Sequence, residues 1–136
     1  MILADTSAWV EFYRRSGSPV HAAMASLLKE PNASTNVVIT EPVVMELLAG
    51  RPASAELAEV RRRLWSFRML HVGELDTWEL AAGIARLCRA RGEMIGSQMD
   101  CLIAAVAIRE GASILHNDSD FEVIARHTDL RIEQMR

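Results

Sequence analysis

The sequence predicts a three-layer α/β/α fold, in which a mainly parallel sheet is flanked by helices. The first observation behind this prediction is that short apolar segments of strand length alternate with longer segments of helical periodicity. The second is that strands separated by helices normally pair in parallel. The chain has 136 residues, half of them hydrophobic, which is the size of one compact domain. We therefore expect a single domain over residues 1–136.

The elements follow one another in a regular order. Strands are predicted over residues 1–4, 36–40, 69–72, 112–116 and 130–132. Helices are predicted over residues 7–15, 19–29, 42–48, 53–67, 76–91, 97–110 and 119–127. Pro42 opens one helix and Gly50 stops it, which is the usual placement of these two residues. The helix that follows Asp100 and ends at Gly111 is apolar on all sides, so it is expected to be central.

Five acids stand out because each lies where an apolar element begins or ends. Asp5 and Asp118 follow strands, and in a parallel sheet ligands gather at the carboxyl ends of strands. Asp100 opens the apolar helix, Asp120 follows Asp118 closely, and Glu46 is surrounded by apolar neighbours that leave it few exposed positions. Carboxylates brought together cannot all stay ionised without a cation. The pattern therefore predicts a site for a hard divalent metal and phosphate chemistry.

Each aspartate also has a structural interpretation. Asp5 can cap a helix, Asp100 completes a Ser97-x-x-Asp capping pattern, and Asp118 is a common turn residue. Asp120 suits the first turn of a helix that carries a capping box from Ser119 to Glu122. Neither caps nor turns explain Glu46, and the site interpretation is favoured for the five acids together. Glu41 lies on a different helix face from Glu46. We interpret it as an acid at the start of a helix that takes no part in the site.

Four segments in order resemble the successive motifs of PIN-domain ribonucleases, and specifically of VapC toxins from bacterial toxin–antitoxin pairs. These segments are residues 1–9 (MILADTSAW), 45–50 (MELLAG), 100–105 (DCLIAA) and 115–121 (LHNDSDF). The resemblance covers the whole chain. It implies cleavage of structured RNA such as tRNA or rRNA, dependence on Mg²⁺ or Mn²⁺, a homodimer, and inhibition by a VapB-type antitoxin.

Carried over by position, the resemblance assigns a role to each acid. Asp5, Asp100 and Asp118 become metal ligands. Asp120 becomes a further ligand or an acid that supports a ligand, and it stays open which of Asp118 and Asp120 contacts the metal. Glu46 becomes a carboxylate that orients water or holds the metal through water. Many family members carry Thr or Ser where this chain has His116, so a hydroxyl beside the site is missing. Thr6 or Ser7 are candidates to replace it, and helix capping is the alternative for both.

The chemistry that follows is hydrolysis of a phosphodiester by an attacking water activated by a divalent ion. Because water attacks and not a ribose hydroxyl, the products are expected to carry 5′-phosphate and 3′-hydroxyl ends. The main alternative is a PIN-like domain that binds RNA or a partner without cutting it. A receiver domain is disfavoured because the only lysine, Lys29, lies in an early helix. A haloacid-dehalogenase-type phosphatase would need Asp-x-Asp where this chain has Asp5-Thr6-Ser7.

Charge and composition indicate which partners and which location the chain is expected to have. The net charge is −3, with 15 basic and 18 acidic residues, and every base but Lys29 is arginine, the side chain that binds phosphate in bidentate fashion. No apolar segment is long enough to span a bilayer and the first strand begins at Met1, so we expect a cytoplasmic protein without a membrane segment. Helix 53–67 and its neighbour carry surplus apolar residues, which indicates a dimer or antitoxin groove.

The cysteines, tryptophans and histidines are not expected to form a site of their own. Cys88 and Cys101 lie in helical apolar patterns and predict buried thiols. The three tryptophans fall at helical apolar spacing, and core packing is predicted for Trp9, Trp65 and Trp78. The four histidines have no metal-type spacing to one another, so packed or solvent-facing roles are expected for them.

Overall fold

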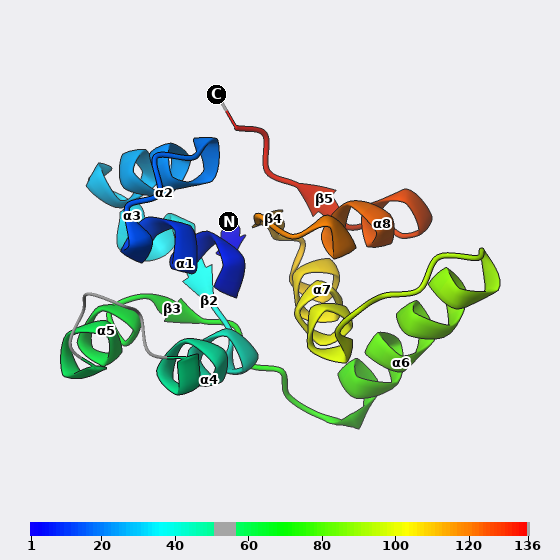
Figure 1. The fold of residues 1–136 in the computed structure, drawn as a ribbon. Coiled ribbons are helices and arrows are strands. Elements are labelled where there is room, and N and C mark those ends of the chain that lie inside the picture. Colours follow the sequence, from blue (N-terminus) through cyan, green and yellow to red (C-terminus); the bar gives the residue numbers. More distant parts are fainter. Residues whose placement is uncertain (51–56, 136) are drawn as a thin grey trace.

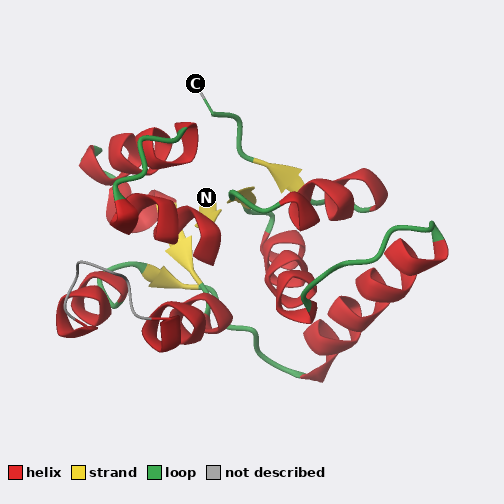
Figure 2. Cartoon of the chain, viewed as in Figure 1, coloured by secondary structure: helices red, strands yellow, loops and turns green. Residues whose placement is uncertain are grey.

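Five short strands form one fully parallel sheet in the order β3-β2-β1-β4-β5. The structure is a computed structural model, and it describes residues 1–50 and 57–135. The strands are β1 (Ile2–Ala4), β2 (Val37–Ile39), β3 (Arg68–Met69), β4 (Ser113–Leu115) and β5 (Arg131–Ile132). Helices lie on both sides of the sheet (Figure 1), and Figure 2 shows the short strands in yellow between the red helices. The predicted α/β/α fold with a parallel sheet is confirmed.

Eight helices connect or flank these strands within the described ranges. They are α1 (Thr6–Arg14), α2 (Pro19–Lys29), α3 (Ala33–Asn36), α4 (Glu41–Gly50), α5 (Leu57–Leu64), α6 (Leu75–Ala90), α7 (Gln98–Glu110) and α8 (Ser119–His127). Seven correspond to predicted helices, and the single turn of α3 was not predicted. Part of the predicted helix 53–67 lies outside the described residues. None of the described helices is both long and apolar enough to cross a membrane.

The strand order creates a switch point between β1 and β4. The chain moves from β1 to β2 and β3 in one direction, and then returns to place β4 on the other side of β1. Ala4 is in register with Leu115 although the two are far apart in the sequence. Loops that leave adjacent strands in opposite directions separate at such a point and leave a crevice at the carboxyl edge of the sheet. The residues that follow β1 and β4 therefore meet there.

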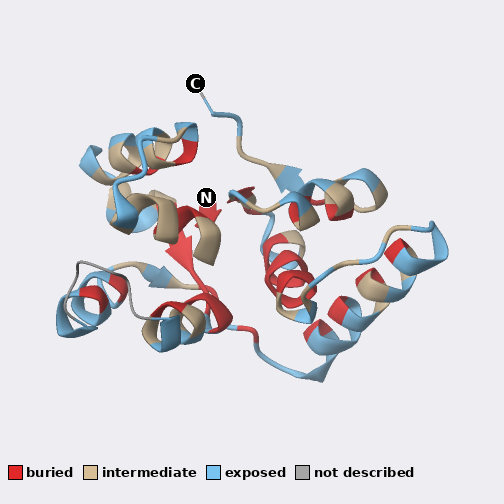
Figure 3. Ribbon diagram, in the orientation of Figure 1, coloured by how far each residue is buried: buried red, intermediate tan, exposed pale blue. Residues whose placement is uncertain are grey.

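Helix α7 is the central helix of the fold, as predicted. All its residues from Asp100 to Ala107 are buried, and Figure 3 shows most of its ribbon in the buried colour. It packs against α6, α8 and α4. Gly111 ends it with a positive φ of 69°, a left-handed conformation that glycine adopts without steric cost, and the chain turns from there into β4.

Two predictions about individual side chains are wrong. Trp9 is fully buried, but Trp65 is 66% exposed and Trp78 is 49% exposed. In α5 the buried positions are Val60 and Leu64, so Trp65, one residue beyond, falls outside the buried face. There the Arg61 guanidinium lies over its ring, 5.4 Å from the centroid. Cys88 and Cys101 are buried free thiols, as predicted.

Candidate metal centre

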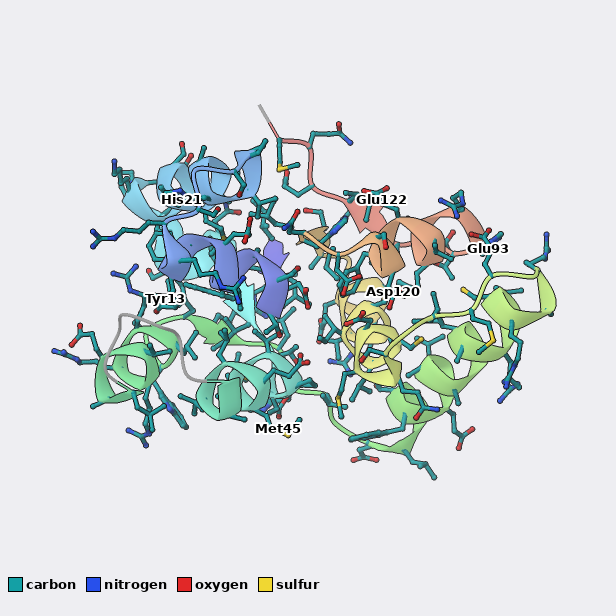
Figure 4. All side chains as sticks on the ribbon, in the orientation of Figure 1. Tyr13, His21, Met45, Glu93, Asp120 and Glu122 are labelled. Carbon is teal, nitrogen blue, oxygen red and sulfur yellow. The ribbon has the colours of Figure 1, made fainter. Side chains whose placement is uncertain are left out.

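Three aspartates converge at the carboxyl edge of the sheet. Asp100, Asp118 and Asp120 each offer an oxygen, and these three oxygens lie within 4.8 Å of one another. Asp100 is in the first turn of α7, Asp118 is the N-cap of α8, and Asp120 is in the first turn of α8. Figure 4 shows Asp120 where α8 approaches α7. A group of this size and ligand type matches the oxygen coordination of a hard divalent cation.

Asp5 directly follows β1 and acts electrostatically on this group, although it is not one of the three acids within 4.8 Å of one another. It is 2% exposed and is the N-cap of α1. Its Oδ2 accepts hydrogen bonds from Ser7 N at 3.0 Å and from Ser7 Oγ at 2.6 Å. Burial raises the pKa of Asp5, and the charge of Glu46 adds to this rise, while the hydrogen bonds from Ser7 oppose it. The Asp5 carboxylate also helps to raise the pKa of Asp100, so the two acids are electrostatically coupled.

Asp100 is the most perturbed acid of the site. Burial, the approach of Asp120, and the negative charges of Asp118 and Asp5 together raise the pKa of Asp100 to about 9. Its side chain is 5% exposed. A carboxyl group in such surroundings holds a proton at neutral pH unless a cation replaces that proton. The arrangement therefore favours binding of a positive ion.

Two buried carboxylate oxygens have no hydrogen-bond partner among the described residues: Oδ1 of Asp5 and Oδ2 of Asp100. Buried polar atoms are nearly always satisfied, and an exception calls for an explanation such as an ion. Both oxygens belong to acids that were predicted from the sequence to be metal ligands. The residues present thus fit a divalent metal, and their donor set is made only of oxygen.

Glu46 faces the site from α4, but it is less buried than its sequence neighbours indicate. It is intermediate in exposure, and the preceding Met45 is 53% exposed. The buried face of α4 is formed by Pro42, Val43 and Leu47, so Glu46 lies beside that face. Its Oε1 accepts a hydrogen bond from Thr6 Oγ1 at 2.7 Å. Because Thr6 directly follows Asp5, this bond holds Glu46 near Asp5.

The capping interpretation fits some of the acids and fails for others. Asp5 and Asp118 do cap helices, because their side chains accept bonds from Ser7 N and Asp120 N. Asp100 does not take part in a Ser97 capping box, since Ser97 makes no side-chain cap bond. The predicted box from Ser119 to Glu122 does not form either. The carboxylate of Glu122 instead meets His116 Nε2 at 3.1 Å.

Two contacts around the site were not predicted from sequence. His116, interpreted as packed or solvent-facing, accepts a hydrogen bond from Asp118 N through Nδ1 at 3.0 Å. The Gly96 N–H donates to Asp120 Oδ2 at 3.1 Å, which fixes that carboxylate from the loop between α6 and α7. The missing hydroxyl at position 116 gave a sequence signal for His116. Gly96 acts through its backbone and gave none.

The similarity to known proteins is clear with this geometry in view. A family model for the PIN domain matches residues 2–127. The chain belongs to the PIN-domain family. It is 43% identical over 136 residues, the full length of both chains, to a VapC ribonuclease from Mycobacterium bovis and to ribonuclease VapC11 from Mycobacterium tuberculosis. Within the PIN family it therefore groups with the VapC ribonucleases, and the resemblance inferred from the four motifs is confirmed.

Solved structures give the same fold for this PIN domain at low sequence identity. The VapBC2 complex from Rickettsia felis, bound to a promoter DNA fragment, matches with a TM-score of 0.71 at 20% identity, covering 98% of both chains. VapC20 from Mycobacterium tuberculosis, described as a toxin that cleaves the sarcin-ricin loop, matches with a TM-score of 0.67 at 24% identity, covering 96% of this chain and 99% of that one. The receiver and phosphatase alternatives are thereby excluded.

Proposed function

We propose that this chain is a metal-dependent endoribonuclease toxin, a single catalytic domain over residues 1–136 that acts in the cytoplasm. Its substrate is structured RNA such as tRNA or rRNA, and its ion is Mg²⁺ or Mn²⁺. The observation that carries the proposal is the convergence of Asp100, Asp118 and Asp120 within 4.8 Å, beside the unpartnered oxygen of the buried Asp5. The full-length relatives named VapC ribonuclease support the RNA substrate.

The residues of the chain have distinct roles in this proposal. The carboxylates of Asp100, Asp118 and Asp120, together with Asp5 Oδ1, would hold the ion. When bound, the ion would activate an attacking water and neutralise the charge that develops on the phosphate oxygens. Glu46, held by Thr6, orients water at the rim of the site. His116 and Gly96 fix Asp118 and Asp120 through backbone contacts, which keeps the oxygens in place before RNA binds.

The deciding experiment compares two isosteric substitutions. Asp5→Asn removes one charge of the site, whereas Asp129→Asn removes the charge of an exposed acid and serves as control. Asp5→Asn should lower Mg²⁺-dependent cleavage of total bacterial RNA by about a hundredfold or more, a loss typical of a disrupted ion site, without lowering the melting temperature. Asp129→Asn should cleave as well as the unaltered protein.

The cleavage products test the mechanism separately. New RNA ends should carry 5′-phosphates and 3′-hydroxyls, and cleavage should stop in EDTA and return with Mg²⁺ or Mn²⁺. Ends with 2′,3′-cyclic phosphates would contradict hydrolysis by water. Full activity of Asp5→Asn would contradict the role of Asp5 in the ion site. No cleavage by the unaltered chain under any metal condition would favour the alternative of a PIN-like domain that binds without cutting.

The same proposal includes a VapB-type antitoxin and a homodimer. Solved neighbours of this fold are VapBC complexes, and apolar side chains are exposed on the α4–α5 side of this chain, namely Met45 at 53%, Leu57 at 55% and Trp65 at 66%. Such a face suits an amphipathic helix. Co-expression with a VapB-type antitoxin should give one larger species in gel filtration that no longer cleaves RNA. Separate elution of the two proteins would contradict this part of the proposal.

A further inference from the structure

The hydrogen-bond ladder between β1 and β4 ends at the metal centre in an unusual way. Asp5 N donates to Leu115 O at 3.0 Å, which is a regular parallel ladder bond. The next bond of a parallel ladder would run from Asn117 N back to Asp5 O. Helix α1 begins at Thr6, however, so Asp5 O already accepts from Ala8 N at 3.0 Å and Trp9 N at 3.2 Å.

The hydroxyl of Ser7 takes the place of that carbonyl. Asn117 N donates to Ser7 Oγ at 2.8 Å, across 110 residues of sequence. A hydroxyl has one proton to give, and Ser7 Oγ gives it to Asp5 Oδ2 at 2.6 Å. One side chain therefore connects Asp5 directly to the loop that carries Asp118.

This arrangement also decides which oxygen of Asp5 is left for a ligand. Oδ2 receives two bonds from Ser7, one from Oγ and one from N. Oδ1 is buried without a partner in the described structure. On the far side of the connection, His116 holds Asp118 N, so the residues flanking Asn117 are fixed as well. Two short hydrogen bonds through Ser7 Oγ thus link Asp5 Oδ2 to the loop that carries Asp118.

We propose that Ser7 is a positioning residue of the metal centre: its hydroxyl ties Asp5 to the β4–α8 loop and thereby holds Asp5 at the right distance from Asp118 and Asp120 to share one cation. This inference rests on the proposed metal-dependent function. It differs from a purely structural role, in which Ser7 would only strengthen the start of α1. The two roles are separable because the first affects ion affinity and the second affects stability.

The test measures Mn²⁺ binding to the protein without RNA, by electron paramagnetic resonance, alongside the melting temperature in EDTA. Ser7→Ala should weaken Mn²⁺ affinity about tenfold, the lower end of the effect of losing a group that orients a ligand. Ser7→Thr keeps the hydroxyl and should restore most of that affinity. At saturating Mn²⁺, Ser7→Ala should lower kcat for RNA cleavage more than it changes KM.

A matched control is available at the start of α2. Ser18 caps that helix, where its Oγ accepts from His21 N at 3.0 Å, and Ser18→Ala should lower the melting temperature without changing Mn²⁺ affinity. If Ser7→Ala behaves in the same way, the inference is wrong and Ser7 is a structural residue. Should Ser7→Ala fail to fold, Ser7→Cys retains the volume with a weaker donor, and unchanged Mn²⁺ affinity in that variant overturns the inference equally.

The outcome for the unaltered chain separates this inference from the proposed function. If the unaltered chain binds Mn²⁺ and Ser7→Ala binds it equally well, only the role of Ser7 is refuted. If the unaltered chain binds no Mn²⁺ at all, the proposed metal dependence falls, and the role of Ser7 falls with it.

Discussion

Glu41 and Asp100 both lie in the first turn of a helix, yet their surroundings are opposite. Glu41 accepts hydrogen bonds from Val72 N and from His71 Nδ1, both at 2.8 Å. Burial acts to raise the pKa of Glu41, but these bonds outweigh it and hold the pKa below its usual value. Asp100 is buried among acids, and its pKa is raised to about 9. An acid surrounded by donors stabilises the fold, whereas an acid surrounded by acids marks a place for a cation.

The largest effect that follows from this contrast is a dependence of stability on pH in the metal-free protein. The pKa of Asp100 is about 9 in the folded chain against an ordinary value of 3.8. Between these values the folded state binds a proton that the unfolded state has lost, so this group makes stability fall as pH rises. We expect Asp100→Asn to raise the melting temperature in EDTA at pH 8 by at least about 5 °C, since 1 kcal/mol corresponds to a few degrees in a chain of this size.

The same measurement at several pH values isolates the contribution of Asp100. The difference in melting temperature between Asp100→Asn and the unaltered chain should shrink toward pH 4, because near its ordinary pKa of 3.8 the Asp100 carboxyl begins to bind a proton in the unfolded state as well. Adding Mg²⁺ should stabilise the unaltered chain and leave Asp100→Asn almost unchanged. A difference that stays constant from pH 4 to pH 8 would show that the raised pKa of Asp100 is not its cause.

Glu41→Gln should give a smaller effect of the opposite sign. Losing the charge weakens the bonds from His71 and Val72 N–H, and because the Glu41 side chain is 48% exposed, the expected loss is only about 1 kcal/mol. The melting temperature should therefore fall by a few degrees, with RNA cleavage per folded molecule unchanged within about twofold. Glu59→Gln, which alters an exposed pair with Arg62, is the control and should change neither quantity.

Much of the fold follows from local pattern. Helix α7 and strands β1, β2 and β4 carry apolar runs bounded by turn residues, and these elements lie where the sequence predicts them. The single turn of α3 has no amphipathic signal of its own. Strand β3 spans Arg68–Met69, earlier than the predicted range 69–72, because only these two residues pair with β2. The exposure of Trp65 depends on which face of α5 is buried, and this is decided by tertiary packing.

The site shows the same division between local and non-local information. The rule that ligands gather at the carboxyl edge of a parallel sheet predicted that Asp5 and Asp118 lie at the same edge, and β1 and β4, which precede them, are adjacent strands. Local sequence does not show whether a given acid will find hydrogen-bond donors. Glu41, interpreted as an acid at a helix start, instead binds the loop after β3 through hydrogen bonds to residues 30 and 31 positions away. The assignment of Asp5, Asp100 and Asp118 as direct ligands stays a prediction. The geometry adds Asp120 to the group that can contact the same ion.

The pairing of β1 with β4 has a consequence for the cell that makes this protein. Asp5 leaves the ribosome long before its partner strand, which ends at Leu115, and Asp118 and Asp120 come later still. A partly synthesised polypeptide therefore holds isolated acids and no assembled centre. The acidic centre can therefore assemble only after residue 120 has left the ribosome, so the first and last acids of the site are synthesised far apart in time.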